Sequence, residues 1–190
     1  MQFEEAGKHI ADKLRKELPE CLVYHSIDHV ADVYQAAARL ANLEDLSEHE
    51  TQLLLTAAQY HDAGFIAKTA GHEEESCRIA RQVLPGFEYT DHDIAQICSL
   101  IKATQVPQNP QNHLEEILAD ADLDYLGRDD YFTISQKLFE ELSLAGEIQT
   151  QEEWKQAQIN FMEKHRYFTS TAINLRQATK EKNLQKIKAS

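Results

Sequence analysis

The sequence predicts an all-α protein, folded as a single-domain helical bundle over residues 1–190. Apolar residues recur at spacings of three and four along almost the whole chain, which is the period of a helix with one buried face. The chain contains only six Gly and four Pro, which disfavours a turn-rich β fold. No segment shows the alternating pattern of a strand, and no repeat or low-complexity segment divides the chain. A chain of this length can bury its own core.

Each expected helix has a recognisable start or stop. Six are predicted at about 3–18, from 26 to beyond 40, and at 47–62, 73–84, 91–104 and 114–126. Ser47 and Glu50 form a capping-box pattern at the start of the third, and Gly127 follows the sixth. Two or three further helices are expected between 129 and 188. The loop 106–112 contains Pro and Asn but is not a Gly/Ser linker, so it does not predict a domain boundary.

Composition excludes several classes of protein. The formal net charge is −13, which argues against nucleic-acid binding as the main role. The three Cys form no Cys-x-x-Cys pair, which favours a reduced, cytoplasmic location. Residues 2–5 are polar and acidic, so no signal peptide is expected. The longest apolar stretches, such as 53–55, are too short to span a membrane.

Histidine and aspartate occur at positions that suggest a metal site within the bundle. His25 and His29 are four residues apart, so in a helix they share a face, although such a pair can also serve packing. His61 and Asp62 end a strongly apolar helix, where a buried carboxylate needs a partner. That partner is either a metal or a buried Arg. Imidazole and carboxylate together suit Zn, Fe, Mn, Co or Ni.

Three aspartates alternate near the end of the sixth predicted helix, and they cannot all face inward. Asp122 shares a face with Leu118 and other apolar residues, so helical periodicity selects it as the inward carboxylate. Asp120 and Asp124 share a face with Glu116 and are expected to be solvated.

The ordered combination of Tyr24-His25 with His29, of His61-Asp62 and of Ala121-Asp122-Leu123 resembles the HD superfamily of metal-dependent phosphohydrolases, which are all-helical. The resemblance covers about residues 22–126 and leaves a helical C-terminal extension at about 128–190. It implies that His29, His61, Asp62 and Asp122 are the metal ligands. It also implies that His25 matches a position proposed to protonate the leaving oxygen in the cyclic-nucleotide phosphodiesterase branch.

Departures from the family pattern bear on the number of metals. Members with two metals usually have further His, of which His72 could be one, but Thr104 stands at a later position and Thr is a poor ligand. One divalent transition metal is therefore expected, with a weaker second metal such as Mg as the alternative. His72 would then contact phosphate or water, or cap a helix. The acidic pair of the guanosine-polyphosphate hydrolase branch is missing after Asp62.

Lys68, Lys102 and Arg128 are candidates for phosphate capture, although each could be an ordinary surface residue. His72 is a fourth candidate for substrate binding. The remaining histidines are expected on the surface, namely His9, His49, His92, His113 and His165.

The function predicted from these residues is hydrolysis of a phosphoester, with a nucleotide or related small molecule as the substrate. Metal-activated water would attack, with His25 as general acid and Asp62 among the residues that serve the reaction directly. Two alternatives stay open at this point. A di-iron oxygenase would need second-metal ligands, and a nucleotide sensor would bind without turnover. No membrane or nucleic-acid partner is expected.

Overall fold

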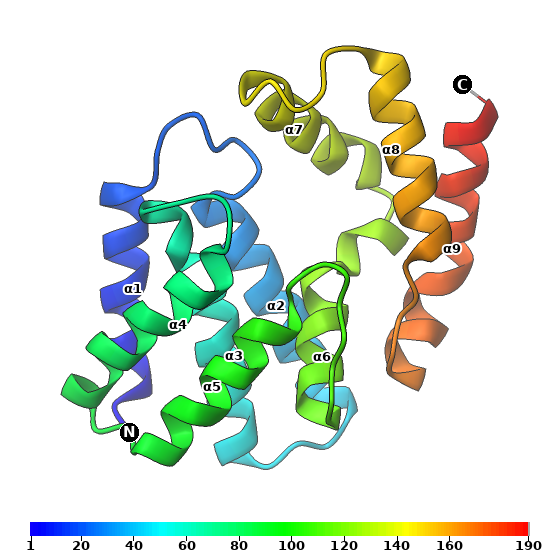
Figure 1. Cartoon of the computed structure of the whole chain (residues 1–190). Coiled ribbons are helices and arrows are strands. Elements are labelled where there is room, and N and C mark those ends of the chain that lie inside the picture. The colour runs from blue at the N-terminus through cyan, green and yellow to red at the C-terminus, as the bar shows by residue number, and fades with distance from the viewer. Residues whose placement is uncertain (190) are drawn as a thin grey trace.

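The computed structural model describes residues 1–189, and within that range the regular secondary structure is entirely helical. In this described part of the chain, nine α-helices are joined by loops and three short 3₁₀ helices (Figure 1). Their bounds are α1 Phe3–Glu17, α2 Ile27–Leu43, α3 Glu48–Tyr60, η1 Ala63–Ile66, α4 His72–Val83, η2 Leu84–Phe87, α5 Asp91–Ala103, α6 His113–Asp122, η3 Asp124–Gly127, α7 Tyr131–Leu144, α8 Gln151–Lys164 and α9 Ser170–Ala189. The predicted all-α fold is confirmed.

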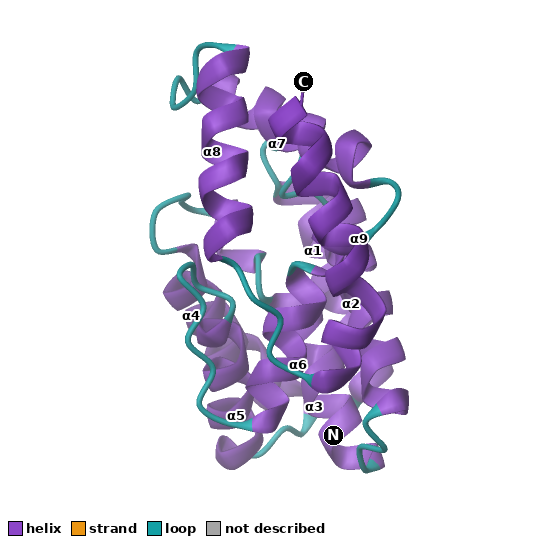
Figure 2. Ribbon diagram, turned by 90° about the vertical axis from the view of Figure 1, so that its right-hand side faces the viewer, coloured by secondary structure: helices purple, strands orange, loops and turns teal. Residues whose placement is uncertain are grey.

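The helices pack around two apolar cores. The larger core lies among α1 to α6, where α3 packs against α1, α2, α5 and α6. A smaller core joins η3 to α7, α8 and α9, and Tyr24 from the loop before α2 belongs to it. Figures 1 and 2 show α7, α8 and α9 gathered at one end of the molecule, beside the α1–α6 bundle. A cavity between the α1–α6 bundle and the α7–α9 group is lined by residues of both.

Local sequence signals place most helix ends. Ser47 caps α3 through the expected reciprocal hydrogen bonds with Glu50, so the predicted capping box is confirmed. The sixth predicted helix ends earlier than expected. α6 stops at Asp122, Leu123 breaks the α-helical path, and η3 continues the chain to Gly127.

The prediction that Asp120 and Asp124 are solvated is wrong, because each is only 1% exposed. The Asp120 carboxylate accepts hydrogen bonds from the backbone N–H of Phe168 and from the N–H and hydroxyl of Thr169. The Asp124 carboxylate pairs with three arginines, Arg39 of α2 at 2.9 Å, Arg176 of α9 at 2.7 Å and Arg128 at 3.6 Å. Helical periodicity correctly separated these residues from Asp122, but chain from 166 onward covers the face that was expected to meet water.

The expected surface position of His165 is also wrong. Its ring is largely enclosed, its Nε2 is buried, and its Nδ1 lies 3.0 Å from the ammonium of the buried Lys180. Burial, together with the Lys180 charge, lowers the pKa of His165 to about 3. The other four histidines expected on the surface are exposed, namely His9, His49, His92 and His113.

Within residues 1–189, no helix has both the length and the apolar character needed to cross a membrane.

Candidate metal centre and its cavity

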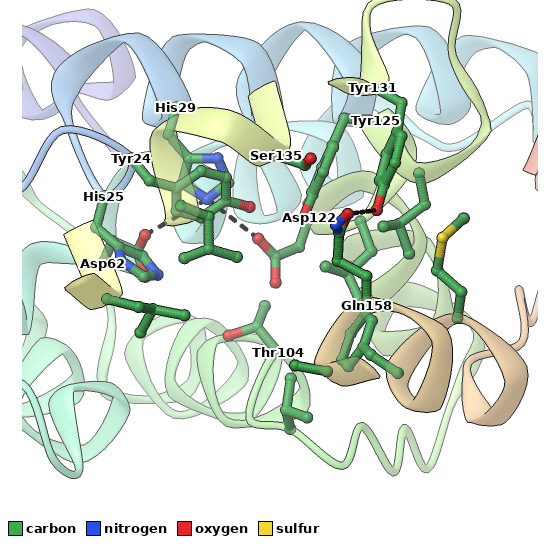
Figure 3. A pocket seen from close by; sticks show the side chains of 18 of the residues that line it. Tyr24, His25, His29, Asp62, Thr104, Asp122, Tyr125, Tyr131, Ser135 and Gln158 are labelled. Carbon is green, nitrogen blue, oxygen red and sulfur yellow. Dashed lines mark hydrogen bonds and ion pairs between the residues drawn. The ribbon is translucent and has the colours of Figure 1, made fainter. Parts of the chain in front are cut away.

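Four side chains converge between α2, the end of α3 and the end of α6. His29 Nε2 lies 3.3 Å from Asp122 Oδ1 and 3.5 Å from Asp62 Oδ2, and these two pairs are drawn in Figure 3. His61 Nε2 lies 3.2 Å from Asp62 Oδ2 and 3.5 Å from Asp122 Oδ1. The two Nε2 atoms are 3.4 Å apart. Two imidazoles and two carboxylates thus point one donor atom each at a common centre.

The turn after α3 is fixed by a neighbouring helix. The Ser76 hydroxyl, from α4, donates to the His61 carbonyl oxygen and accepts from the Gly64 N–H. Gly64 lies so close to α4 that a Cβ would sit 2.0 Å from the His72 carbonyl oxygen. Glycine is therefore required by this close approach. These contacts hold His61 and Asp62 in register, so that consecutive residues reach the same centre.

The donor set fits a divalent transition metal. Asp62 Oδ2 is buried, and its nearest partners among the described residues are the two imidazole Nε2 atoms, at 3.2 and 3.5 Å without hydrogen-bond geometry, which is costly unless a cation is bound there. His61 Nδ1–H donates to the Ala58 carbonyl oxygen at 2.8 Å, and this directs the Nε2 lone pair toward the centre. Single ligand atoms of His29, His61 and Asp122 all lie within 4.8 Å of one another. Two nitrogen and two oxygen donors suit Mn, Fe, Co, Ni or Zn.

The ionisable side chains of the cluster interact strongly with one another. Burial raises the pKa of Asp122, but hydrogen bonds from His29 and His61 outweigh burial and bring it to about 2. Burial lowers the pKa of His61, whereas the two carboxylates outweigh that effect and leave it well above its usual value. The cluster therefore favours ionised carboxylates beside a positive charge.

His25 lies beside the centre and is held by a residue from α7. Its Nδ1 contacts Glu141 Oε1, while Glu141 Oε2 accepts the backbone N–H of Tyr24 at 2.9 Å and of His25 at 3.0 Å. Burial raises the pKa of Glu141, but these bonds, first of all the one to the His25 ring, lower it below its ordinary value. A buried carboxylate thus fixes the orientation of the His25 ring.

His72, the first residue of α4, also reaches the centre. Its Nε2 lies 3.4 Å from Asp62 Oδ1, the carboxylate oxygen that points away from His61. The Phe65 ring stacks against His25 on one side and His72 on the other, with ring centroids 4.2 and 4.0 Å away. Two imidazoles beyond the ligand set therefore border the same space.

The centre opens into a cavity of about 410 Å³, a volume that suits a small organic ligand. His25, His29, Asp62, His72 and Asp122 line one end of it. The other walls come from η3, α7 and α8. The Thr104 side chain also lines the cavity, and its hydroxyl donates to the Ile101 carbonyl oxygen (Figure 3).

The three predicted phosphate-binding cations lie elsewhere. Lys68 is exposed in the loop before α4. Lys102 pairs with Glu74 at 2.7 Å and lines a different cavity. Arg128 pairs with Asp32 at 2.7 Å and Asp130 at 2.8 Å. None of the three lines the cavity at the metal cluster.

Several residues that build this site carry no signal in the sequence. Glu141 lies 116 residues from His25, and nothing in its local pattern distinguishes it from other acids of α7. In the sequence, the aromatic and apolar residues of α7 and α8 indicate only the buried face of an amphipathic helix, and nothing shows that some of them line a cavity. Glu73, beside His72, is an acidic residue that also lines the cavity.

Comparison with known proteins identifies the family. The family model for the HD domain matches residues 26–124, slightly more than half of the chain, and this range contains all four converging side chains. The chain belongs to the HD domain family. HD domains bind divalent metals, and the His29, His61 and Asp122 cluster can hold one in this member.

The fold extends beyond the matched HD domain. A crystal structure of a Lactobacillus plantarum protein, a structural genomics target, superimposes with a TM-score of 0.69 at 20% identity, covering 100% of this chain and 98% of the other. This likeness shows a shared fold that includes α7 to α9. No curated protein matches the chain.

Proposed function

We propose that this HD domain protein is a metal-dependent phosphohydrolase that cleaves a phosphoester of a small molecule, with nucleotides among the candidates. The observation that carries the proposal is the convergence of His29, His61, Asp62 and Asp122 at the inner end of a cavity large enough for such a substrate. HD domain proteins are mostly metal-dependent phosphohydrolases, which supports the same reaction class.

The four converging residues would hold a single divalent metal. When bound, such a metal supplies Lewis acidity, lowering the pKa of a water molecule and polarising a phosphoryl oxygen. Thr104 engages its hydroxyl with a backbone carbonyl, which supports one tightly held metal rather than two. His72, 3.4 Å from Asp62 Oδ1, would orient that carboxylate and border the phosphate.

His25 is placed to move a proton. Glu141 contacts Nδ1, so the opposite nitrogen, Nε2, is the atom that can give its proton to the leaving-group oxygen. Stacking on Phe65 keeps the ring plane fixed. Because His25 is not among the converging side chains, its role and that of the metal ligands can be separated by mutation.

A metal-supplemented hydrolysis screen tests the proposal. Purified protein, loaded in turn with Mn, Fe, Co, Ni or Zn, is given nucleoside monophosphates, cyclic nucleotides and simple phosphoesters under multiple-turnover conditions. Metal-dependent release of phosphate or of the monoester, abolished by His61→Ala, is expected. If no metal and no substrate supports turnover above that of His61→Ala, the proposed function is wrong.

A further inference from the structure

The outer part of the cavity has an apolar wall. It is formed by α7, α8 and the loop between them, and its apolar members include Leu138, Leu142, Ile148, Trp154, Phe161 and Met162. These side chains come from the second helical group, whereas the four converging residues come from the α1–α6 bundle. A ligand that reaches the cluster would therefore place its remaining part against hydrocarbon and aromatic surface.

Between the cluster and this wall, the polar groups are neutral. The Tyr131 hydroxyl donates to Gln158 Oε1 at 3.2 Å, and Ser135 points to the same region (Figure 3). These groups can accept or donate single hydrogen bonds. They offer nothing that would neutralise a second ionised group on the ligand.

The charges that line the cavity are concentrated at the cluster end. Among the described lining residues there is no Lys and no Arg, whereas Asp62, Glu73 and Asp122 are acidic. A nucleoside polyphosphate carries several negative charges, and burying the additional ones without cations is unfavourable. One phosphate can be matched by the metal together with His25 and His72.

The nearest cations of the C-terminal region line a separate, smaller cavity. Lys164 and Arg166 line a space of about 170 Å³, which shares Val106, Leu123 and Phe161 with the large cavity. The shared side chains are apolar and lie between the two spaces. A polyphosphate bound at the cluster would reach Lys164 only by passing these apolar side chains. Polyphosphates are therefore the alternative ligand class that an experiment has to exclude.

We propose that the substrate is a phosphate monoester of an uncharged, apolar alcohol, either aliphatic or aromatic, with its phosphate at the cluster and its organic group against the α7–α8 wall. This inference rests on the proposed phosphohydrolase function. In the reaction, the water oxygen bonds to phosphorus, the bond from phosphorus to the alcohol oxygen breaks, and the His25 proton passes to that oxygen. A proton that the water carried onto the phosphate then returns to His25, which restores the protonated ring. The products are inorganic phosphate and the free alcohol, without any oxidation or reduction.

A homologous series of n-alkyl phosphates, from methyl to hexyl, tests the wall with the metal-loaded protein. Each methylene that enters an apolar wall contributes about 0.8 kcal/mol, which corresponds to about a fourfold rise in kcat/KM until the wall is covered. We expect that rise, and we expect hexyl phosphate to exceed adenosine triphosphate. Phosphate release that is equal along the series, or fastest with the triphosphate, would overturn the inference while the hydrolase function stands.

A binding measurement gives a readout that does not depend on turnover. Trp154 is the single tryptophan of the chain and lines the apolar wall, so its fluorescence reports directly on occupancy. Hexylphosphonate has no ester bond to cleave. Titrations followed by this fluorescence should give it a Kd at least tenfold lower than that of methylphosphonate.

Leu138→Gln and Leu144→Gln form a matched pair on α7 for this measurement. Leu138 lines the cavity, whereas Leu144 is 69% exposed and does not. The Leu138 variant should lose most of the preference for hexylphosphonate, and the Leu144 variant should keep it. If no ester is hydrolysed but this Leu138-dependent binding persists, the hydrolase proposal is wrong and the apolar ligand class stands. If hexylphosphonate does not bind preferentially, the inference is wrong.

Discussion

Glu141 of α7 contacts the His25 imidazole with one carboxylate oxygen and accepts two consecutive backbone N–H groups, those of Tyr24 and His25, with the other. One side chain therefore joins the second helical group to the start of α2. It fixes both the path of the chain into α2 and the ring that would donate the proton. Because Glu141 has no direct contact with the converging ligands, its removal should affect proton transfer before metal retention.

Glu141→Gln is expected to lower kcat by about 10- to 100-fold, less than the roughly 10²- to 10⁴-fold that a general acid contributes, because His25 itself is still present. The amide can still accept a backbone N–H but cannot stabilise a protonated His25 ring. Metal content, measured by elemental analysis, should stay at the wild-type level. Glu140→Gln, on the exposed face of the same helix, is the control and should leave kcat unchanged. Equal rates in both variants would remove Glu141 from the mechanism.

His61→Ala should abolish metal retention through dialysis, because it removes one of the two nitrogen donors that lie within 3.5 Å of both carboxylates. His113→Ala, at an exposed position, should retain the wild-type metal content. Metal should also stabilise the wild-type fold, by about 2.7 kcal/mol at a concentration one hundred times its Kd. A thermal melt with and without chelator measures this difference, and an unchanged Tm would argue against a metal bound at the cluster.

Asp124→Asn should destabilise the fold by about 1–3 kcal/mol, because the partly exposed Arg39, Arg176 and Arg128 lose the buried charge that they share. Urea unfolding provides the free energy. The matched control is Asp129→Asn, which lies two residues after the end of η3 and is exposed, and a change within about 0.5 kcal/mol is expected there. If the free energy of unfolding fell equally in the two variants, the ion pairs of Asp124 would contribute no more to stability than an exposed aspartate does.

The pKa of His165 predicts acid sensitivity. Burial and the Lys180 charge bring it to about 3 in the folded protein, whereas an unfolded histidine titrates near 6.5. Between these pH values the unfolded chain binds one more proton, so the free energy of unfolding falls as pH falls. The loss from this residue is about 2 kcal/mol between pH 7 and 5.

His165→Asn isolates this contribution, because its side-chain oxygen can still accept from Lys180 but does not titrate. Between pH 7 and 5, the free energy of unfolding of the variant should fall by about 2 kcal/mol less than that of the wild type. Urea unfolding at each pH measures both values. Parallel losses in both proteins would contradict the assignment.

Gly64→Ala should displace the turn that positions His61 and Asp62. Its Cβ would sit 2.0 Å from the His72 carbonyl oxygen, and backbone at that distance must move. A destabilisation of about 1–3 kcal/mol and weaker metal retention are expected, since Asp62 lies two residues away. Gly86→Ala is the control, because open space surrounds the position where its Cβ would be. An Ala at 64 that leaves both stability and metal content intact would refute this account of the turn.

Helix periods and caps predicted most of the fold, since those signals are local. The same periodicity chose Asp122 over Asp120 and Asp124 as the inward carboxylate, and the structure brings Asp122 to the cluster; its role as a ligand stays a prediction. Predictions of solvent exposure from the local sequence were wrong where a segment far along the chain covers a helix face. Asp120 is enclosed by residues 168 and 169, and Asp124 by Arg39 and Arg176. An acidic face looks the same in sequence whether water or a partner segment meets it.

The same limit explains the phosphate-binding candidates. Lys68 and Arg128 are close in sequence to predicted ligands, and Lys102 lies near the end of the fifth predicted helix, but such positions do not determine where a side chain points. The side chain of Arg128 turns to Asp32 and Asp130 rather than to the cavity. Glu141 shows the converse, because a residue far along the chain is brought to His25 by the packing of α7.

The two walls of the cavity come from different stretches of chain: the converging ligands lie within the matched range 26–124, whereas the apolar wall on α7 and α8 lies beyond it. If the proposed function holds, substitutions among the apolar wall residues of α7 and α8, as distinct from Glu141, would change which organic group fits without altering the four converging side chains. Such a layout would let specificity diverge while the reaction is kept. It also makes α7 and α8 the place to begin when a new substrate is to be engineered onto this scaffold.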